Sequence, residues 1–124
     1  MKQEKKPLTI AVVDDDESIL DSVSTVLDDQ DWVTRIYASG EAFLSDFKQH
    51  KLDCIILDAN LPSSSAVTIA RAIDQNNSTP IIVLTAYPGG EQTCKIKELG
   101  VNSILVKPVT AKVLIKKIQE TVNR

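Results

Sequence analysis

The sequence predicts a doubly wound α/β sandwich, in which helices cover both faces of a five-stranded parallel sheet. Short, unbroken apolar runs recur at 8–13, 53–58 and 81–84, and such runs are typical of strands buried on both faces. Segments with apolar residues three and four apart separate the runs, and strands that alternate with helices imply parallel pairing. The chain has 124 residues and is 43% hydrophobic, which is the size and composition of one compact domain.

The first half of the chain is expected to contain three strands and two helices. The strands are Leu8–Val13, Val33–Ala38 and Asp53–Asp58. The first helix begins at Glu17 and ends at 28–31, and its apolar residues have helical spacing: Ile19, Leu20, Val23, Val26 and Leu27. Ser39 is placed to cap a short second helix that ends at His50. The side chains expected to face inward on this helix are Ala42, Phe43, Leu44 and Phe47.

The second half is expected to contain two strands, Ile81–Leu84 and Ser103–Val106, and three helices. The third helix carries Val67, Ile69, Ala70 and Ile73 and runs out at 76–78. A mobile loop, Tyr87–Gly90, leads into the fourth helix, which Gly100 ends. Thr110 is placed to cap the fifth helix. On that helix Val113, Leu114, Ile118 and Val122 are expected to face the sheet, and Lys112, Lys116 and Lys117 to face water.

Charge and composition exclude several classes of protein. The formal net charge is -3 and no long basic cluster occurs, so this chain is not expected to contact nucleic acid or an acidic membrane surface directly. No signal peptide and no membrane-spanning run is visible. Cys54 and Cys94 lack metal-ligand spacing and are interpreted as reduced thiols in the cytoplasm. The first strand–helix turn lacks the glycines of a nucleotide- or flavin-binding site.

Polar residues follow the apolar runs at the points where the predicted strands end. They are Asp14, Asp15, Asp58, Thr85 and Lys107. Because parallel strands bring their carboxyl ends to one edge of the sheet, these side chains are expected to converge there. Two carboxylates about 4 Å apart repel by roughly 4 kcal/mol at an effective dielectric constant of 20, so the group requires cations. An open site of oxygen ligands suits Mg²⁺.

This set of residues has the chemistry of phosphoryl transfer. Asp58 would be the nucleophile, Lys107 would neutralise the charge of the moving group, and Thr85 would donate a hydrogen bond. Ala86 leaves space for the incoming group. The structural alternatives are that the aspartates only cap helices and that Lys107-Pro108 is only a surface turn.

The residues resemble the receiver domain of response regulators, the phospho-acceptor module of two-component signal transduction. The resemblance spans about residues 8 to 122 and rests on four matching motifs: Val12-Val13-Asp14-Asp15, Leu57-Asp58 with Pro62 four residues later, Thr85-Ala86 and Lys107-Pro108. It implies a flavodoxin-like sheet of order 2-1-3-4-5 and a single receiver domain at 8–124. The polar residues 1–7 are expected to form a flexible lead-in.

The resemblance also implies roles for individual residues. Asp58 would be the phosphorylated aspartate. Mg²⁺ would be held by Asp14, Asp15, Asp58 and the backbone carbonyl of Asn60, and Thr85 and Lys107 would contact the phosphoryl oxygens. The donor would be a histidine on a sensor kinase or phosphotransfer protein. The receiver would catalyse its own phosphorylation and report it to an effector or a fused output domain through the face of the fourth helix, last strand and fifth helix, with a homodimer as one possible outcome.

Three positions bear on how such a switch would work. The family usually has an aromatic residue three positions before the lysine, and this chain has Ile104, so aromatic switching is not expected. Ala66 stands where the family commonly has glycine, which is expected to alter the backbone of the loop. Tyr87, two residues beyond Thr85, either slows hydrolysis of the acyl phosphate or only packs over its loop. Ile104 and the altered loop at Ala66 keep open a second hypothesis, a receiver-like interaction module that is not phosphorylated.

Overall fold

The computed structural model describes residues 7–76, 79–101 and 103–122. The lead-in expected at 1–7, apart from Pro7, and Asn77 and Ser78 at the expected end of the third helix lie outside the described residues. The strands are β1 (Thr9–Val13), β2 (Val33–Tyr37), β3 (Cys54–Asp58), β4 (Ile81–Thr85) and β5 (Ser103–Val106). The helices are α1 (Glu17–Asp28), α2 (Gly40–Asp46), α3 (Ser65–Asn76), α4 (Glu91–Glu98) and α5 (Ala111–Val122).

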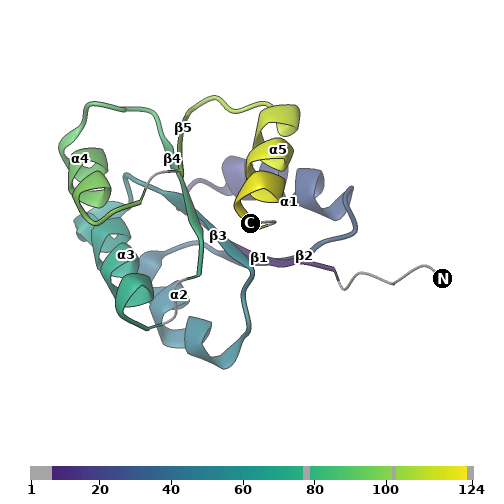
Figure 1. Ribbon diagram of the computed structural model, residues 1–124, viewed down its shortest axis with the longest axis horizontal. Coiled ribbons are helices and arrows are strands. Elements are labelled where there is room, and N and C mark those ends of the chain that lie inside the picture. The colour runs from purple at the N-terminus through teal and green to yellow at the C-terminus, as the bar shows by residue number, and fades with distance from the viewer. Residues whose placement is uncertain (1–6, 77–78, 102, 123–124) are drawn as a thin grey trace.

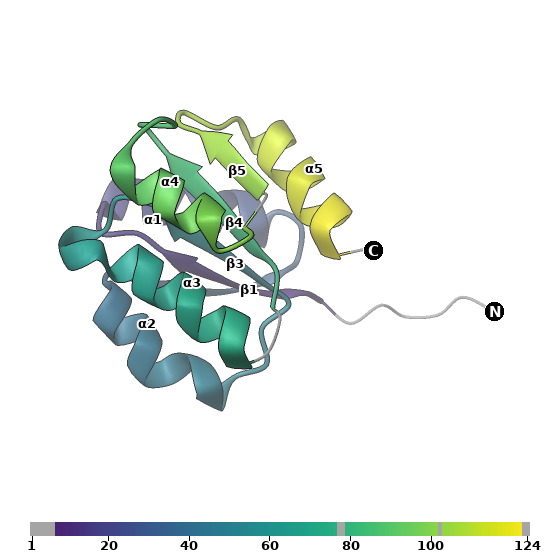
Figure 2. The same ribbon diagram turned by 60° about the vertical axis from the view of Figure 1, so that its left-hand side comes forward.

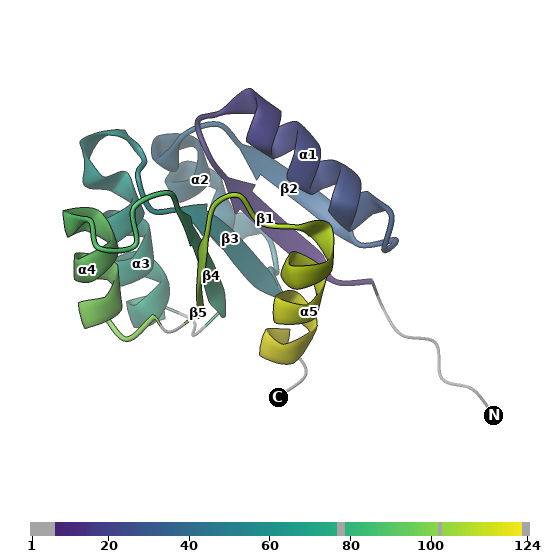
Figure 3. The ribbon, with the colours of Figure 1, turned by 90° about the horizontal axis from the view of Figure 1, so that it is seen from above.

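The five strands form one parallel sheet of order β2-β1-β3-β4-β5, which confirms the predicted fold class and strand order. Helices α1 and α5 cover one face, and α2, α3 and α4 cover the other (Figures 1 and 2). Seen from above in Figure 3, β1 and β3 lie at the middle of the sheet, between the two layers of helices. Asp14, which follows β1, and Asp58, the last residue of β3, therefore lie at the ends of neighbouring central strands.

Alternate residues of the strands supply the two cores. Val13, Leu57 and Val83 pack with α2, α3 and α4, whereas Val12, Ile56 and Ile82 pack with α1 and α5. The first core adds the aromatic residues Phe43 and Phe47, whose rings stack with centroids 5.0 Å apart. Because both faces are covered, the interior positions of β1 and β3 are apolar on both sides of the sheet, as the sequence predicted.

The predicted caps are present. Ser39 Oγ accepts a hydrogen bond from the Ala42 amide at 3.1 Å, and Thr110 Oγ1 accepts one from the Val113 amide at 3.2 Å. Gly100 follows α4 with φ +94°, a conformation that side chains other than glycine's rarely adopt. The largest difference from the predicted ends is in the second helix, which was expected to end at His50: α2 ends at Asp46, and a 3-10 helix covers Phe47–Gln49 before His50.

Two side chains predicted to face inward are exposed instead. Ala42 lies on the exposed side of α2 because Phe43 and Phe47, four residues apart, define the buried side, and Ala42 is about 100° away from Phe43. Val113 is 47% exposed, because Leu114 and Ile118 occupy the face of α5 that contacts the sheet. In both cases the sequence contained more apolar residues than the helix face could bury.

The connection after β3 has its unusual backbone conformation at Ser63, and not near Ala66 as expected. Ala66 is fully buried and helical within α3, so it does not alter the loop. The left-handed residue is Ser63, with φ 59°. The first turn of α3 then passes close to α2: a Cβ added to Gly40 would lie 2.6 Å from both Cβ and Oγ of Ser65. Glycine at position 40 therefore allows α2 to approach α3.

Both cysteines are free thiols, with Cys54 buried and Cys94 exposed. Burial raises the pKa of the Cys54 thiol to about 12. Within the described residues, no helix combines the length and the apolar character that crossing a membrane requires.

Candidate functional site

The carboxyl edge of the sheet carries the predicted site residues. Asp14 follows β1, Asp58 ends β3, Thr85 ends β4 and Lys107 follows β5. The backbone holds these strand ends in register: the Ala59 amide donates to the Leu84 carbonyl at 2.9 Å, and the Lys107 amide to the Thr85 carbonyl at 2.8 Å. Asp14, Asp58 and Thr85 are buried, while Lys107 keeps 21% of its side chain exposed.

The Lys107 ammonium joins two of the acids. Its Nζ lies 3.3 Å from Asp14 Oδ2 and 3.4 Å from Asp58 Oδ1. Burial acts to lower the pKa of Lys107, but the carboxylates of Asp58 and Asp14 outweigh it, and the pKa is raised. The lysine is therefore a fixed positive charge at the centre of the acidic edge.

One lysine does not balance the acids around it. Carboxylate oxygens of Asp14, Asp15 and Asp58 lie within 4.8 Å of one another, so three acids face one ammonium. Burial and the charge of Asp58 raise the pKa of Asp14 even though the Asp16 amide and Lys107 oppose the shift. The edge is thus a place where a further cation lowers the electrostatic energy, and its oxygen donors are those that Mg²⁺ prefers.

The three consecutive aspartates divide their roles. Asp16 is the N-cap of α1 and accepts hydrogen bonds from the amide and hydroxyl of Ser18 at 2.9 and 2.7 Å, which lower its pKa. Asp14 and Asp15 belong to the acidic group instead. The capping alternative therefore holds for Asp16 alone among the three.

The Thr85 hydroxyl is fully buried in a hydrogen-bond network. It donates to Asn60 Oδ1 at 3.3 Å and accepts from the Tyr87 amide at 2.9 Å. The hydroxyl of Thr93, on α4, lies 3.0 Å from Thr85 Oγ1 and 3.2 Å from the Tyr87 carbonyl. Sequence reasoning missed Thr93 and the side chain of Asn60. The available signal was that Thr93 precedes the buried Ile96 by one helical turn.

The other singled-out residues surround this network. Ala86 is exposed beside Thr85, and Tyr87 is 63% exposed, so its ring is not packed down over the loop. Ile104 is half-buried against the core under α2, α3 and α4. The Asn60 amide donates to Asp58 Oδ1 at 3.1 Å, which places the Asn60 backbone next to the acidic group.

Comparison with known proteins identifies the family. The sequence pattern of the response regulator receiver domain matches residues 10–119. The chain belongs to this family. The receiver domain is 27% identical over 116 residues to the sensory transduction protein RegX3 of Mycobacterium tuberculosis, covering 94% of this chain and 51% of RegX3. It is 26% identical to the DNA-binding response regulator MtrA of Mycobacterium leprae, covering 93% of this chain and 51% of MtrA. The chain thus spans about half the length of these relatives.

Solved structures agree with the fold. The BeF₃-activated receiver domain of DrrB superposes with a TM-score of 0.85 at 32% identity, covering 96% of this chain and all of that one. The chemotaxis protein CheY4 of Vibrio cholerae gives a TM-score of 0.81 at 30% identity, covering 94% of this chain and 99% of CheY4.

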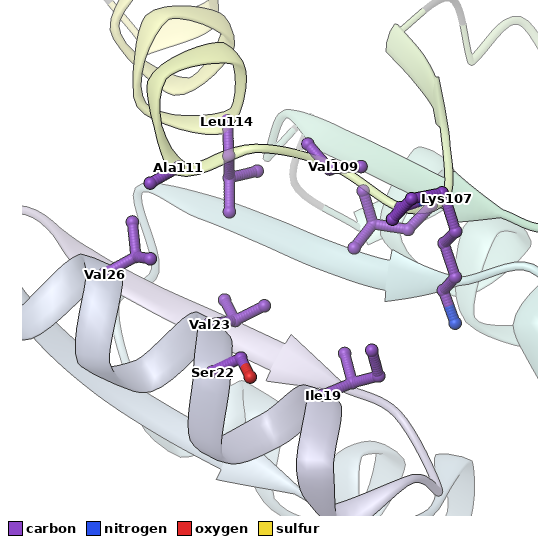
Figure 4. A pocket seen from close by; sticks show the side chains of 10 residues that line it. Ile19, Ser22, Val23, Val26, Lys107, Val109, Ala111 and Leu114 are labelled. Atoms are coloured by element: carbon purple, nitrogen blue, oxygen red, sulfur yellow. The ribbon is translucent and has the colours of Figure 1, made fainter.

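The receiver domain also has an apolar groove beside the acidic edge. It lies between α1 and α5, has a volume of about 470 Å³ and includes Ile19, Val26, Leu114 and Lys107 among its lining residues (Figure 4). Figure 4 shows the apolar side chains of α1 facing those of the segment that leads into α5, with Lys107 at one end of the groove. A molecule resting in the groove would therefore lie next to the ammonium that contacts Asp58.

Proposed function

We propose that this receiver domain is a phospho-acceptor switch in which Asp58 takes a phosphoryl group from a histidine of a partner protein. The single observation that carries the proposal is the position of Lys107, whose ammonium contacts both Asp14 and Asp58 in a group of three acids. A partly buried lysine so placed neutralises negative charge at the point where a phosphoryl group would arrive. An acid on the open surface is stabilised by water and would not require a neighbouring ammonium.

The transfer forms one bond and breaks another. Asp58 Oδ1 already accepts hydrogen bonds from Lys107 and the Asn60 amide, so we assign the attack to Oδ2. The Oδ2–P bond forms as the P–N bond of the phosphohistidine breaks, and the imidazole leaves with the electron pair and takes up a proton. The product is an acyl phosphate, and later attack of water on phosphorus returns the carboxylate and inorganic phosphate.

The residues present suit a magnesium ion. We propose that Asp14, Asp15, Asp58 and the backbone carbonyl of Asn60 hold it; the donors are all oxygen and carry more negative charge than Lys107 balances. When bound, the ion would offset the charge of the transferring phosphoryl oxygens. Lys107 supplies the second positive charge, the Thr85 hydroxyl supplies a hydrogen bond, and the exposed Ala86 leaves room for the group to enter.

Acetyl phosphate with Mg²⁺ tests the proposal without a partner. Intact-mass measurement is expected to detect a gain of one phosphoryl group in the wild type and none in Asp58→Asn. Asp53→Asn is a matched control, because Asp53 directly precedes β3 at the opposite, amino-terminal edge of the sheet, where its carboxylate accepts from the Thr9 amide. No mass gain in the wild type, or the same gain in Asp58→Asn, would favour the interaction module that is not phosphorylated.

The partner would dock along the groove between α1 and α5. We base this on continuity: the groove reaches Lys107, and a histidine on a helix resting there would face Asp58. Val26→Asp is expected to slow transfer from a phosphohistidine protein at least tenfold and to leave the reaction with acetyl phosphate unchanged. Thr25→Asp, exposed on the same helix and outside the groove, is the control. Equal effects of Val26→Asp on both donors would contradict this docking site.

Tyr87 is proposed to control the lifetime of the acyl phosphate. Its ring is largely exposed two residues after Thr85, where it can obstruct the approach of water to the phosphoryl group. Tyr87→Ala should shorten the lifetime, measured as phosphate release from the phosphorylated protein after removal of acetyl phosphate. An unchanged or longer lifetime would remove this role.

A further inference from the structure

The strongest connection between the acidic edge and a helix runs through Thr93. This residue is on α4, yet it is fully buried, and its hydroxyl lies 3.0 Å from Thr85 Oγ1. The residues next to it on the helix, Gln92 and Cys94, are respectively half-buried and exposed, so Thr93 is a polar group placed inside the protein. A buried hydroxyl of this kind requires partners, and both of its partners belong to the site or its loop.

The protons of the network can be assigned from donor and acceptor types. The Tyr87 amide donates to Thr85 Oγ1, and Asn60 Oδ1 accepts, so the single proton of the Thr85 hydroxyl points to Asn60. The remaining lone pair of Thr85 Oγ1 then accepts from Thr93. Thr85 is thus held by three bonds in a position where its proton is not available to Asp58.

A phosphoryl group on Asp58 would change this assignment. To donate to a phosphoryl oxygen, the Thr85 hydroxyl must release Asn60 Oδ1 and turn toward Asp58. The Thr93 proton then loses its acceptor, but the Tyr87 carbonyl, 3.2 Å away, is a second one. Thr93 can therefore change partner without being left unpaired.

We propose that Thr93 is a positioning residue that holds Thr85 in its resting orientation and transmits the movement of Thr85 to α4 and the Tyr87–Gly90 loop. The inference rests on the proposed function of Asp58. It gives this chain a connection from the site to α4 that does not use an aromatic residue, which fits the aliphatic side chain of Ile104 on β5.

The variant Thr93→Val isolates the hydroxyl. Valine has nearly the same shape, and the Tyr87 carbonyl retains the Gly90 amide, which donates to it at 2.8 Å, so no buried acceptor is left unpaired. Thr93→Ser keeps the hydroxyl and loses the methyl group. Thr68→Val, at an exposed position on α3, controls for the substitution itself. Urea unfolding of each variant establishes that the fold is intact.

The first measurement is binding of beryllium fluoride with Mg²⁺, a stable mimic of the phosphoryl group. Because Thr93→Val removes one hydrogen bond that holds Thr85 at rest, it is expected to tighten binding about fivefold. Thr93→Ser and Thr68→Val should bind as the wild type does. Equal affinity of Thr93→Val and the wild type, or an affinity of Thr93→Ser equal to that of Thr93→Val, overturns the inference.

The second measurement follows α4 directly. In ¹H–¹⁵N spectra, beryllium fluoride should shift the amides of Cys94–Glu98 in the wild type and Thr93→Ser, and shift them much less in Thr93→Val. Without the ligand, the Tyr87 amide should exchange with solvent faster in Thr93→Val, since its acceptor Thr85 is less firmly held. An unchanged exchange rate would contradict the resting role of Thr93. A wild type that binds no beryllium fluoride would instead overturn the function proposed for Asp58, and this inference with it.

Discussion

Two carboxylates of this receiver domain lie in opposite electrostatic surroundings. Asp46, at the end of α2, is a single carboxylate surrounded by three donor side chains. Its Oδ2 accepts from Tyr37 Oη at 2.6 Å and from Arg35 at 3.3 Å, and it lies 3.2 Å from His50 Nε2. Asp14, at the end of β1, shares one lysine with Asp58 and lies beside Asp15. The pKa of Asp46 is lowered, chiefly by the Tyr37 hydrogen bond, whereas burial raises the pKa of Asp14.

The difference separates an acid with a structural role from one that we propose holds a metal ion. The environment of Asp46 is complete, and its hydrogen bonds join β2 to α2. The environment of Asp14 has one ammonium for three carboxylates, and a protein tolerates such an excess of negative charge when a ligand supplies a further cation. The number of donors around a carboxylate, and not its burial alone, therefore indicates which acid is available for binding.

The largest expected effect is that of magnesium on stability. Binding to the folded state alone raises the free energy of unfolding by about 2.7 kcal/mol at a concentration one hundred times the dissociation constant. The melting temperature of the wild type and of Asp46→Asn should therefore rise by several degrees in Mg²⁺, and that of Asp14→Asn should rise much less. A similar rise in Asp14→Asn would contradict the assignment of Asp14 as a metal ligand.

The second effect is that neutralising Asp14 and neutralising Asp46 should change the free energy of unfolding in opposite directions when a chelator is present. Asp14→Asn should increase the free energy of unfolding, on the order of 1 kcal/mol, because it removes repulsion among the three acids. Asp46→Asn should decrease it, because Tyr37 and Arg35 lose an ionised acceptor. Urea unfolding at pH 7 measures both free energies of unfolding. Changes of the same sign would contradict the view that Asp14 and Asp46 lie in opposite electrostatic surroundings.

The smallest effect is the acid dependence that Asp46 contributes. Since its folded-state pKa lies below the ordinary value of 3.8, its contribution to stability is present above that value and is lost as pH falls through the lowered pKa. The wild type should therefore lose more stability than Asp46→Asn between pH 5 and pH 2. Unfolding followed by circular dichroism at each pH gives the two slopes, and parallel slopes would count against the lowered pKa.

Much of the fold could be predicted because its signals are local. The apolar runs of β1, β3 and β4 and the capping residues Ser39 and Thr110 each specify structure within a few positions. The convergence of Asp14, Asp58 and Lys107 followed from parallel pairing, since strand ends must meet at one edge. The buried face of a helix was predicted less accurately, because Ala42 and Val113 are apolar but each is adjacent in sequence to the residue that is buried in the core.

The hydrogen-bond networks could not be predicted. Thr93 lies among polar and charged residues of α4, and its spacing of one helical turn from Ile96 is a weak signal of burial that says nothing of its partners. It is buried beside Thr85 because α4 packs with that side toward the sheet. Arg35 and Asp46 are eleven residues apart and meet only because α2 folds back along β2. The different roles of the three aspartates, with Asp16 capping α1 and Asp14 and Asp15 in the acidic group, likewise depend on the backbone turn that starts α1.

The close approach of α2 to α3 has a consequence for recombining this domain with its relatives. Because Ser65 fills the space that a side chain at position 40 would need, the two positions form a single steric unit. In a library that varies both, larger residues at 40 should survive only beside glycine at 65, so a graft that exchanges one helix must carry the facing position of the other.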